Sequence, residues 1–193
     1  MAKLLQVVPP ILTVLLAGCC NPPTISNLDV PLRGQLTGMW CWAASGQMTM
    51  NFIHPASNVQ QCDEANKRFG RTDCCHNPVP GACINGGWPE YPKYNFKADM
   101  TTNAGLSWAD IKKQIYCRKK PFAFSWHWDG GGGHMMVVIG YFTLDGANYV
   151  SVDNPWPPTG GAQEIITYDN YVGGAAYDHT HWNDYYNITY TGA

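Results

Sequence analysis

The spacing of apolar residues changes along the chain, and the first part of the pattern predicts helices. Residues 40–52 are good or neutral helix formers apart from Gly46, with Trp42 and Phe52 available to pack. A turn signal at His54-Pro55 ends this segment. We therefore predict a first helix over residues 40–52.

Two further helices follow from cap signals. The second is predicted to begin after Asn58 as its cap and to end at Gly70. The third is predicted to begin at Ser107, because the spacing from Ser107 to Asp110 resembles a capping box. These three helices occupy the first two thirds of the chain.

After residue 120 the pattern changes to aromatic and β-branched residues, which favour strands. Asp145-Gly146 is typical of a hairpin turn between two of these strands. The predicted strands cover residues 122–128, 135–143, 148–152, 164–168 and 186–190. A helical first part followed by an antiparallel second part predicts an α+β fold with a cleft between the halves.

Length and charge narrow the classes of function. A chain of 193 residues accommodates one domain with a core of its own, and we expect a monomer. A formal net charge of -2 with 13% charged residues lacks the basic excess that nucleic-acid binding requires. Nucleic acid is therefore not an expected partner.

The N-terminus has the pattern of an export signal over residues 1–18. Lys3 precedes an apolar stretch, residues 4–16, which is too short to span a bilayer comfortably. The following Leu16-Ala17-Gly18-Cys19 resembles the bacterial lipobox, in which the cysteine is acylated after cleavage. We predict an exported bacterial lipoprotein, periplasmic or at the cell surface, held to the membrane by a lipid on Cys19, with a secreted product as the alternative. The predicted divisions are a signal peptide (1–18), a tether (19–33) and a domain (34–193).

Export to an oxidising compartment makes disulfides the expected state of most of the cysteines. Cys62, Cys74, Cys75 and Cys83 crowd into one segment and allow three connectivities, whereas Cys20 and Cys117 have no assigned partner. The four-cysteine segment lacks the paired Cys-x-x-Cys spacing of zinc sites. We expect disulfides here and no metal.

Cys41 stands apart from the other cysteines, at the start of the first predicted helix. A helix N-terminus and a nearby imidazolium are the two common devices that lower the pKa of a thiol and make it nucleophilic. His134 offers the imidazole, because it opens an apolar strand directly after the glycines at 130–133. Cys41 and His134 are therefore a candidate nucleophile and base.

Three sequence elements around these residues resemble the papain family. Gln35, five intervening residues and Cys41-Trp42-Ala43 resemble its oxyanion glutamine and nucleophile helix. His134 to Tyr141 resembles its histidine strand, and Asn154-Pro155-Trp156 resembles its Asn-Ser-Trp element. The resemblance covers roughly residues 35–189. It implies a papain-like fold, with an N-terminal helical part that carries the nucleophile helix, a C-terminal antiparallel sheet or half-barrel, and the active-site cleft between them.

The resemblance also implies a role for each matched residue. Cys41 would be the nucleophile, His134 the base and acid, and Asn154 the group that orients the imidazole. Gln35 would donate to the oxyanion together with the backbone N–H of Cys41. The implied reaction is hydrolysis of peptide or amide bonds in a protein or peptide substrate through an acyl-thioester, without a cofactor.

Two departures point to a compact bacterial form of the family. Gly38, Met39 and Trp40 replace the Cys-Gly-Ser/Ala triplet, so one characteristic disulfide is missing. His134 also follows Cys41 by only 93 residues, against about 130 in papain and cathepsins. The chain is similar in this respect to bacteriocin-processing peptidases and plant-pathogen effector proteases.

Some questions remain open at the level of sequence. In compact relatives an aspartate often precedes Pro-Trp, so Asp153 is the alternative to Asn154 as the orienting residue. The same constellation also serves acyl transferases, deamidases and amidases, and an inactive lipid-anchored binding module is a further alternative. His179 and His181, near Asp178 and Asp184, are expected to lie in a solvated loop.

Overall fold

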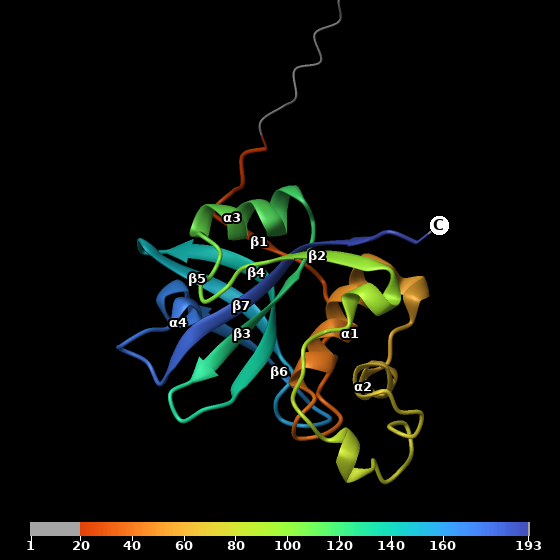
Figure 1. Cartoon of the computed structure of the whole chain (residues 1–193). Helices are drawn as coiled ribbons and strands as arrows, with labels where there is room; N and C mark the ends of the chain where they lie inside the picture. The colour runs from red at the N-terminus through yellow and green to blue at the C-terminus, as the bar shows by residue number, and fades with distance from the viewer. Residues whose placement is uncertain (1–19, 193) are drawn as a thin grey trace, which may run out of the picture.

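In the computed structural model, a helical part packs against a seven-stranded sheet (Figure 1). The structure describes residues 20–192, so the predicted signal peptide and Cys19 lie outside the described residues. The helices are α1 (Cys41–Ile53), α2 (Gln61–Phe69), α3 (Trp108–Lys112) and α4 (Tyr168–Val172), with 3-10 turns η1 (Pro55–Ser57), η2 (Gly81–Cys83) and η3 (Tyr91–Tyr94) and a π-helical turn η4 (Lys113–Cys117). The strands are β1 (Ile25–Asn27), β2 (Phe96–Met100), β3 (Phe122–Trp128), β4 (Gly133–Leu144), β5 (Ala147–Asn154), β6 (Ala162–Thr167) and β7 (His179–Tyr190).

The sheet is antiparallel throughout, and most of it was predicted. Six of its strands lie in the order β2-β7-β3-β4-β5-β6. The seventh, β1, is not part of this order and pairs with β4. The turn between β4 and β5 has positive φ at Asp145 and Gly146, 50° and 80°, as expected for a two-residue hairpin loop whose twist matches its strands. The predicted α+β layout is confirmed.

Helix α1 lies between the sheet and α2 and is buried along most of its length. Two indole groups fix its N-terminal turn: Trp40 Nε1 donates to the Cys83 carbonyl (2.8 Å), and Trp42 Nε1 donates to the Asn85 carbonyl (3.1 Å). Gly46 fits a close approach, because a Cβ there would stand 2.7 Å from the carboxylate oxygens of buried Glu64. The start of α1 is therefore held in a defined place.

The other two predicted helices differ in part from expectation. Helix α2 begins at Gln61 rather than directly after Asn58, because Asn58 has φ 44° and ends η1. Its predicted end at Gly70 is confirmed, with φ 63° at that glycine. Helix α3 has the predicted cap, in which Ser107 Oγ accepts from the Asp110 N–H (3.2 Å), but it passes into η4 after one turn.

Two strands and a helix were not predicted: β1, β2 and α4. Strand β1 falls within the segment expected as a tether, and residues 25–27 pair with residues 140–142 of β4. Leu28 and Val30 are buried in the main core. Part of the segment over 19–33 thus belongs to the fold. A three-residue strand is too short to give a period that the sequence reveals.

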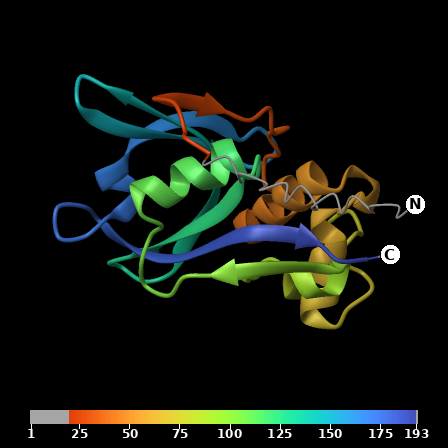
Figure 2. The same ribbon diagram turned by 90° about the horizontal axis from the view of Figure 1, so that it is seen from above.

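Strand β7 is longer than predicted, and its first half corrects an expectation. His179 and His181 lie in β7 rather than in a solvated loop, and their exposed fractions are 3% and 5%. Figure 2 shows β7 (blue) running beside β2 (lime) along one border of the sheet. The prediction failed because the polar residues of this half face other polar groups inside the fold.

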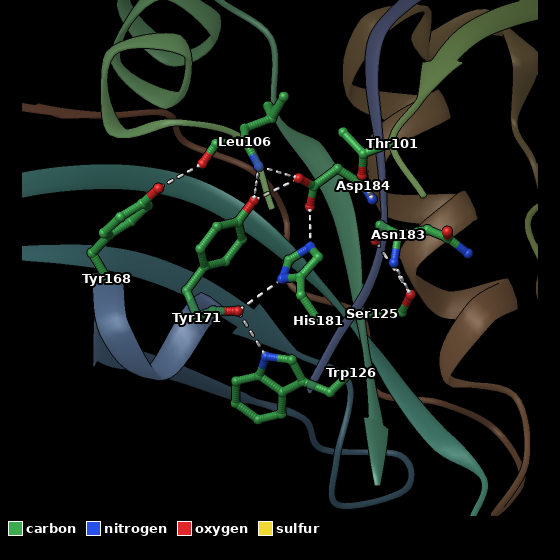
Figure 3. A network of polar contacts seen from close by, with 9 residues as sticks. All are labelled: Thr101, Leu106, Ser125, Trp126, Tyr168, Tyr171, His181, Asn183 and Asp184. Atoms are coloured by element: carbon green, nitrogen blue, oxygen red, sulfur yellow. Dashed lines mark hydrogen bonds and ion pairs between the residues drawn. The ribbon is translucent and has the colours of Figure 1, made fainter. Parts of the chain in front are cut away.

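Those polar groups form a buried network around Asp184 (Figure 3). Asp184 Oδ2 accepts from the Tyr171 hydroxyl and from the Leu106 N–H, both at 2.6 Å. His181 Nε2 lies 2.9 Å from Asp184 Oδ1, and His181 Nδ1 lies 2.8 Å from the Tyr171 carbonyl oxygen. The network joins β7, α4 and the segment before α3, so these elements share one set of satisfied polar groups.

The disulfides are Cys62–Cys75, Cys74–Cys83 and Cys20–Cys117. The first two resolve the three connectivities left open for the four-cysteine segment. Two clusters with metal-ligand spacing in the described part each contain both sulfurs of one of these disulfides, which are then not thiolates. None of the helices within residues 20–192 has the length and apolarity that a bilayer span requires.

Candidate active site

Cys41 is the first residue of α1 and the one cysteine among residues 20–192 that is outside a disulfide. Burial raises the pKa of its thiol, while hydrogen bonds from the backbone of Met135, Trp42 and Cys41 itself partly lower it again. Met135 directly follows His134, so the thiol contacts the start of β4. The helix terminus and these amides favour the thiolate, and burial opposes it.

His134 is the second residue of β4 and contacts the last residue of β5. Its Nε2 lies 2.7 Å from Asn154 Oδ1, an oxygen that can only accept, so Nε2 carries the proton of this contact. The other ring nitrogen, Nδ1, is then free to accept a proton. Burial lowers the pKa of His134, while the hydrogen bond to Asn154 and the charge of Glu164 raise it.

The Asn154 carboxamide is held on both of its atoms. Oδ1 also accepts from the Trp156 N–H (2.9 Å), and Nδ2 donates to Glu164 Oε1 (2.9 Å). Donors thus surround the oxygen and an acceptor meets the nitrogen, which fixes the orientation of the amide. Glu164 was missed by the sequence analysis, because nothing in its local pattern indicates that β6 brings it beside β5.

Asp153 lies next to Asn154 in the chain but makes different contacts. Its Oδ1 accepts from Gln163 Nε2 (2.9 Å), and its Oδ2 is buried without a partner among the described residues. Burial raises the pKa of Asp153 to about 6, with the Gln163 hydrogen bond acting in the opposite direction. Since successive residues of a strand point to opposite faces, only one of the two can reach His134, and Asn154 makes the contact.

Gln35 is buried and tied to the loop after Asn154. Its N–H donates to the Pro155 carbonyl (2.9 Å), and its own carbonyl accepts from the Thr159 N–H (2.8 Å). In its side chain, Nε2 donates one hydrogen to the Thr37 carbonyl (2.7 Å). An amide nitrogen has two hydrogens, so a second remains for another acceptor.

These side chains meet at a cavity of about 330 Å³ between the helical part and the sheet. Cys41, Gln35 and His134 all line it. An adjoining cavity of about 350 Å³ is lined by His134, Asn154 and Trp156 among others. The structure thus brings together the four residues predicted from sequence, and Asp153 lines neither cavity.

The cavity walls also include residues outside the predicted catalytic set. Trp88 and Trp182 meet edge to face, with ring centroids 4.8 Å apart. Met39, Arg68 and Ser125 also line the cavity. A tryptophan in a strand is equally typical of a core residue, so Trp182 gave no signal of its own.

The comparisons with known proteins agree with this geometry. The model of the Peptidase_C39 like family matches residues 27–190. The chain belongs to this family. It is therefore a papain-like cysteine peptidase, and peptides are the class of substrate that follows. No curated protein sequence matches this peptidase.

Solved structures support the fold of the peptidase. Procathepsin L 3 from the larval midgut of Tenebrio molitor is similar with a TM-score of 0.53 at 11% identity, over 89% of this chain and 72% of that one. Procathepsin B S9 from Trypanosoma congolense is similar with a TM-score of 0.56 at 14% identity, over 95% and 82% of the two chains. At such identities the likeness concerns the fold, and the papain-like fold predicted from sequence is confirmed.

Proposed function

We propose that this protein is an exported peptidase that hydrolyses peptide bonds through an acyl-thioester on Cys41. His134 Nδ1 takes the thiol proton, and the sulfur attacks the scissile carbonyl carbon. The oxyanion accepts hydrogen bonds from the free N–H of Gln35 Nε2 and from the Cys41 backbone N–H. His134 then gives its proton to the leaving amine, and a water activated by the same imidazole hydrolyses the thioester.

The observation that carries this proposal is the hydrogen bond between His134 and Asn154 beside the cavity that holds Cys41. An imidazole that donates from Nε2 presents an unprotonated Nδ1, which is the state a general base needs. Asn154 in turn is fixed by Trp156 and Glu164. This chain of contacts supports the roles proposed for these residues.

The export and anchoring parts of the proposal have separate support. Six of the eight cysteines are paired in disulfides, which form and persist in oxidising compartments. A lipid on Cys19 would anchor the mature chain to a bacterial membrane, and cleavage without acylation would release it as a secreted monomer. Metabolic labelling with a fatty-acid probe, comparing the wild type with Cys19→Ala, separates these two products.

The first experiment on the chemistry is intact-mass analysis after treatment with a peptidyl epoxide that alkylates thiols. Wild type is expected to gain one adduct at Cys41, Cys41→Ala none, and His134→Ala one at a much lower rate. Lys67→Gln, an exposed substitution on α2 away from the candidate active site, is the matched control and should be labelled like wild type. An unmodified Cys41 in folded wild type would contradict the peptidase chemistry and leave an inactive binding module.

A second assay separates hydrolysis from the related activities of the same constellation. With peptide substrates, a peptidase releases a new amino terminus, a deamidase releases ammonia, and an acyl transferase needs an added amine. A new amino terminus without added amine is the expected product. Ammonia release from glutamine side chains with the backbone intact would instead assign the deamidase function.

A further inference from the structure

One segment of the fold concentrates positive charge. Five of the twelve Lys and Arg residues of the chain lie between residues 112 and 120. The nearest acidic residue in the sequence is Asp110, two residues before this range. The chain as a whole has a net charge of -2, so the remaining surface is acidic overall. We call this the basic segment: Lys112, Lys113, Arg118, Lys119 and Lys120.

Little in the described structure neutralises the basic segment. Lys113 Nζ lies 3.8 Å from Asp110, but both side chains are more than half exposed, so this pair is weak. Lys119 Nζ stands 4.2 Å from the centre of the Tyr116 ring, and Lys120 Nζ donates to the Thr189 hydroxyl (2.8 Å). Burial lowers the pKa of Lys120, and the positive charge of Arg118 lowers it further.

The basic segment surrounds the point at which the described chain begins. Cys117 lies in its middle and is bonded to Cys20, the first described residue. Figures 1 and 2 show the start of the described chain next to α3. If Cys19 carries a lipid, no spacer separates that lipid from the disulfide, so the basic segment would lie directly at the membrane surface.

The candidate active site lies at the other end of strand β4. The Thr143 N–H donates to the Thr24 carbonyl (3.0 Å), which places the N-terminal segment beside the last residues of β4. The basic segment ends at Lys120, two residues before Phe122, which pairs with Val138 of β4. His134 pairs with Trp126, six residues beyond Lys120, and a strand rises about 3.3 Å per residue, so the basic segment and His134 are about 20 Å apart along the strand. Contact at the basic segment therefore leaves the cleft open.

We propose that the basic segment binds an anionic phospholipid surface and holds the peptidase with its cleft facing away from the membrane. This inference rests on the proposed export and anchoring. Beside a lipid anchor, each Lys or Arg held close to an anionic membrane surface adds about 1 kcal/mol of attraction. The phosphate headgroups would neutralise the positive charge of the basic segment, which the neighbouring side chains of the protein leave largely unpaired.

The test is flotation of the full chain with vesicles of phosphatidylcholine, alone or mixed with phosphatidylglycerol. Lys113→Gln/Lys119→Gln removes two exposed charges of the basic segment, and Lys67→Gln/Lys93→Gln removes two exposed lysines elsewhere. Wild type and the second variant should prefer the anionic vesicles, and added salt should reduce that preference. The first variant should bind anionic vesicles more weakly by a factor of about thirty, at about 1 kcal/mol per lysine.

Equal weakening in both variants, or equal binding of wild type to both kinds of vesicle, would overturn the proposal. The residues before Cys20 are common to all variants, so they cancel in the comparison. Epoxide labelling of Cys41 in the same samples tests the fold and the proposed chemistry independently of vesicle binding. Should the first variant misfold, Arg118→Gln/Lys119→Gln repeats the comparison.

Discussion

His134 Nε2 and Asn154 Oδ1 lie 2.7 Å apart, and this contact joins the start of β4 to the end of β5. Residue 154 reaches the imidazole and residue 153 does not, although both were candidates. Variants at positions 153 and 154 therefore test which of the two side chains orients His134.

Asn154→Ala should lower kcat/KM by roughly a hundredfold, within the range for loss of acid–base positioning. The imidazole would lose the acceptor that fixes its tautomer. Asp153→Asn should change kcat/KM little, because Asp153 contacts Gln163 instead. Hydrolysis rates on one peptide substrate decide the matter, and a larger loss in Asp153→Asn would assign the orienting role to that residue.

Asp153 should make stability depend on pH. Its pKa is raised by burial to about 6, above the value of about 3.9 in an unfolded chain. Because the folded pKa is the higher one, the stabilisation is complete below about pH 4 and is lost as the pH rises through 6. Relative to Asp153→Asn, wild type should lose on the order of 1–2 kcal/mol of unfolding free energy between pH 4 and 7, after allowance for solvent screening.

Urea unfolding at the two pH values measures this difference. Asp145→Asn is the matched control, since Asp145 lies in the exposed hairpin turn. A difference between wild type and Asp153→Asn that stays constant over this range would show that Asp153 ionises as freely in the folded chain as in the unfolded one.

Asp184→Ala should destabilise the fold by about 3–5 kcal/mol. The change leaves the Leu106 N–H, the Tyr171 hydroxyl and His181 Nε2 without their buried acceptor. Asp178→Ala is the control, because Asp178 also contacts a histidine but is 84% exposed. Thermal or urea unfolding should place the control within about 0.5 kcal/mol of wild type. An equal loss of unfolding free energy in the two variants would show that the buried network does not stabilise the fold.

The long disulfide should contribute more to stability than the short one. Cys20–Cys117 closes a loop of 97 residues and Cys62–Cys75 one of 13. The loop-entropy relation gives about 4.7 kcal/mol for a loop near 100 residues and about 3 for one near 15. Cys20→Ser/Cys117→Ser should therefore unfold at lower urea than Cys62→Ser/Cys75→Ser, and the reverse order would point to structure retained in the unfolded chain.

The parts of the site that sequence predicted are those with local signals. Helix α1 was predicted nearly to its ends, with Cys41 at its start, because helix formers and the stop at His54-Pro55 are neighbours in the chain. Strands β3, β4 and β5 followed from β-branched runs and the Asp145-Gly146 turn. Cys41 and His134 were candidates from their places at a predicted helix start and strand start, and Gln35 and Asn154 were found by resemblance, which depends on residues within each short motif.

Tertiary structure decided what depends on distant segments. Glu164 reaches Asn154 because β6 pairs with β5, and His181 is buried among residues of α4, β3 and β7, including Tyr171, Phe124 and Asp184. The pairing of Cys20 with Cys117 joins residues 97 positions apart, which no spacing rule determines. Sequence by itself determined which segments are helices and strands around Cys41 and His134, since those preferences are local. Packing decided which side chain faces Asn154, which cysteine pairs with Cys20 and which buried group binds His181, because each depends on which segments the fold brings together.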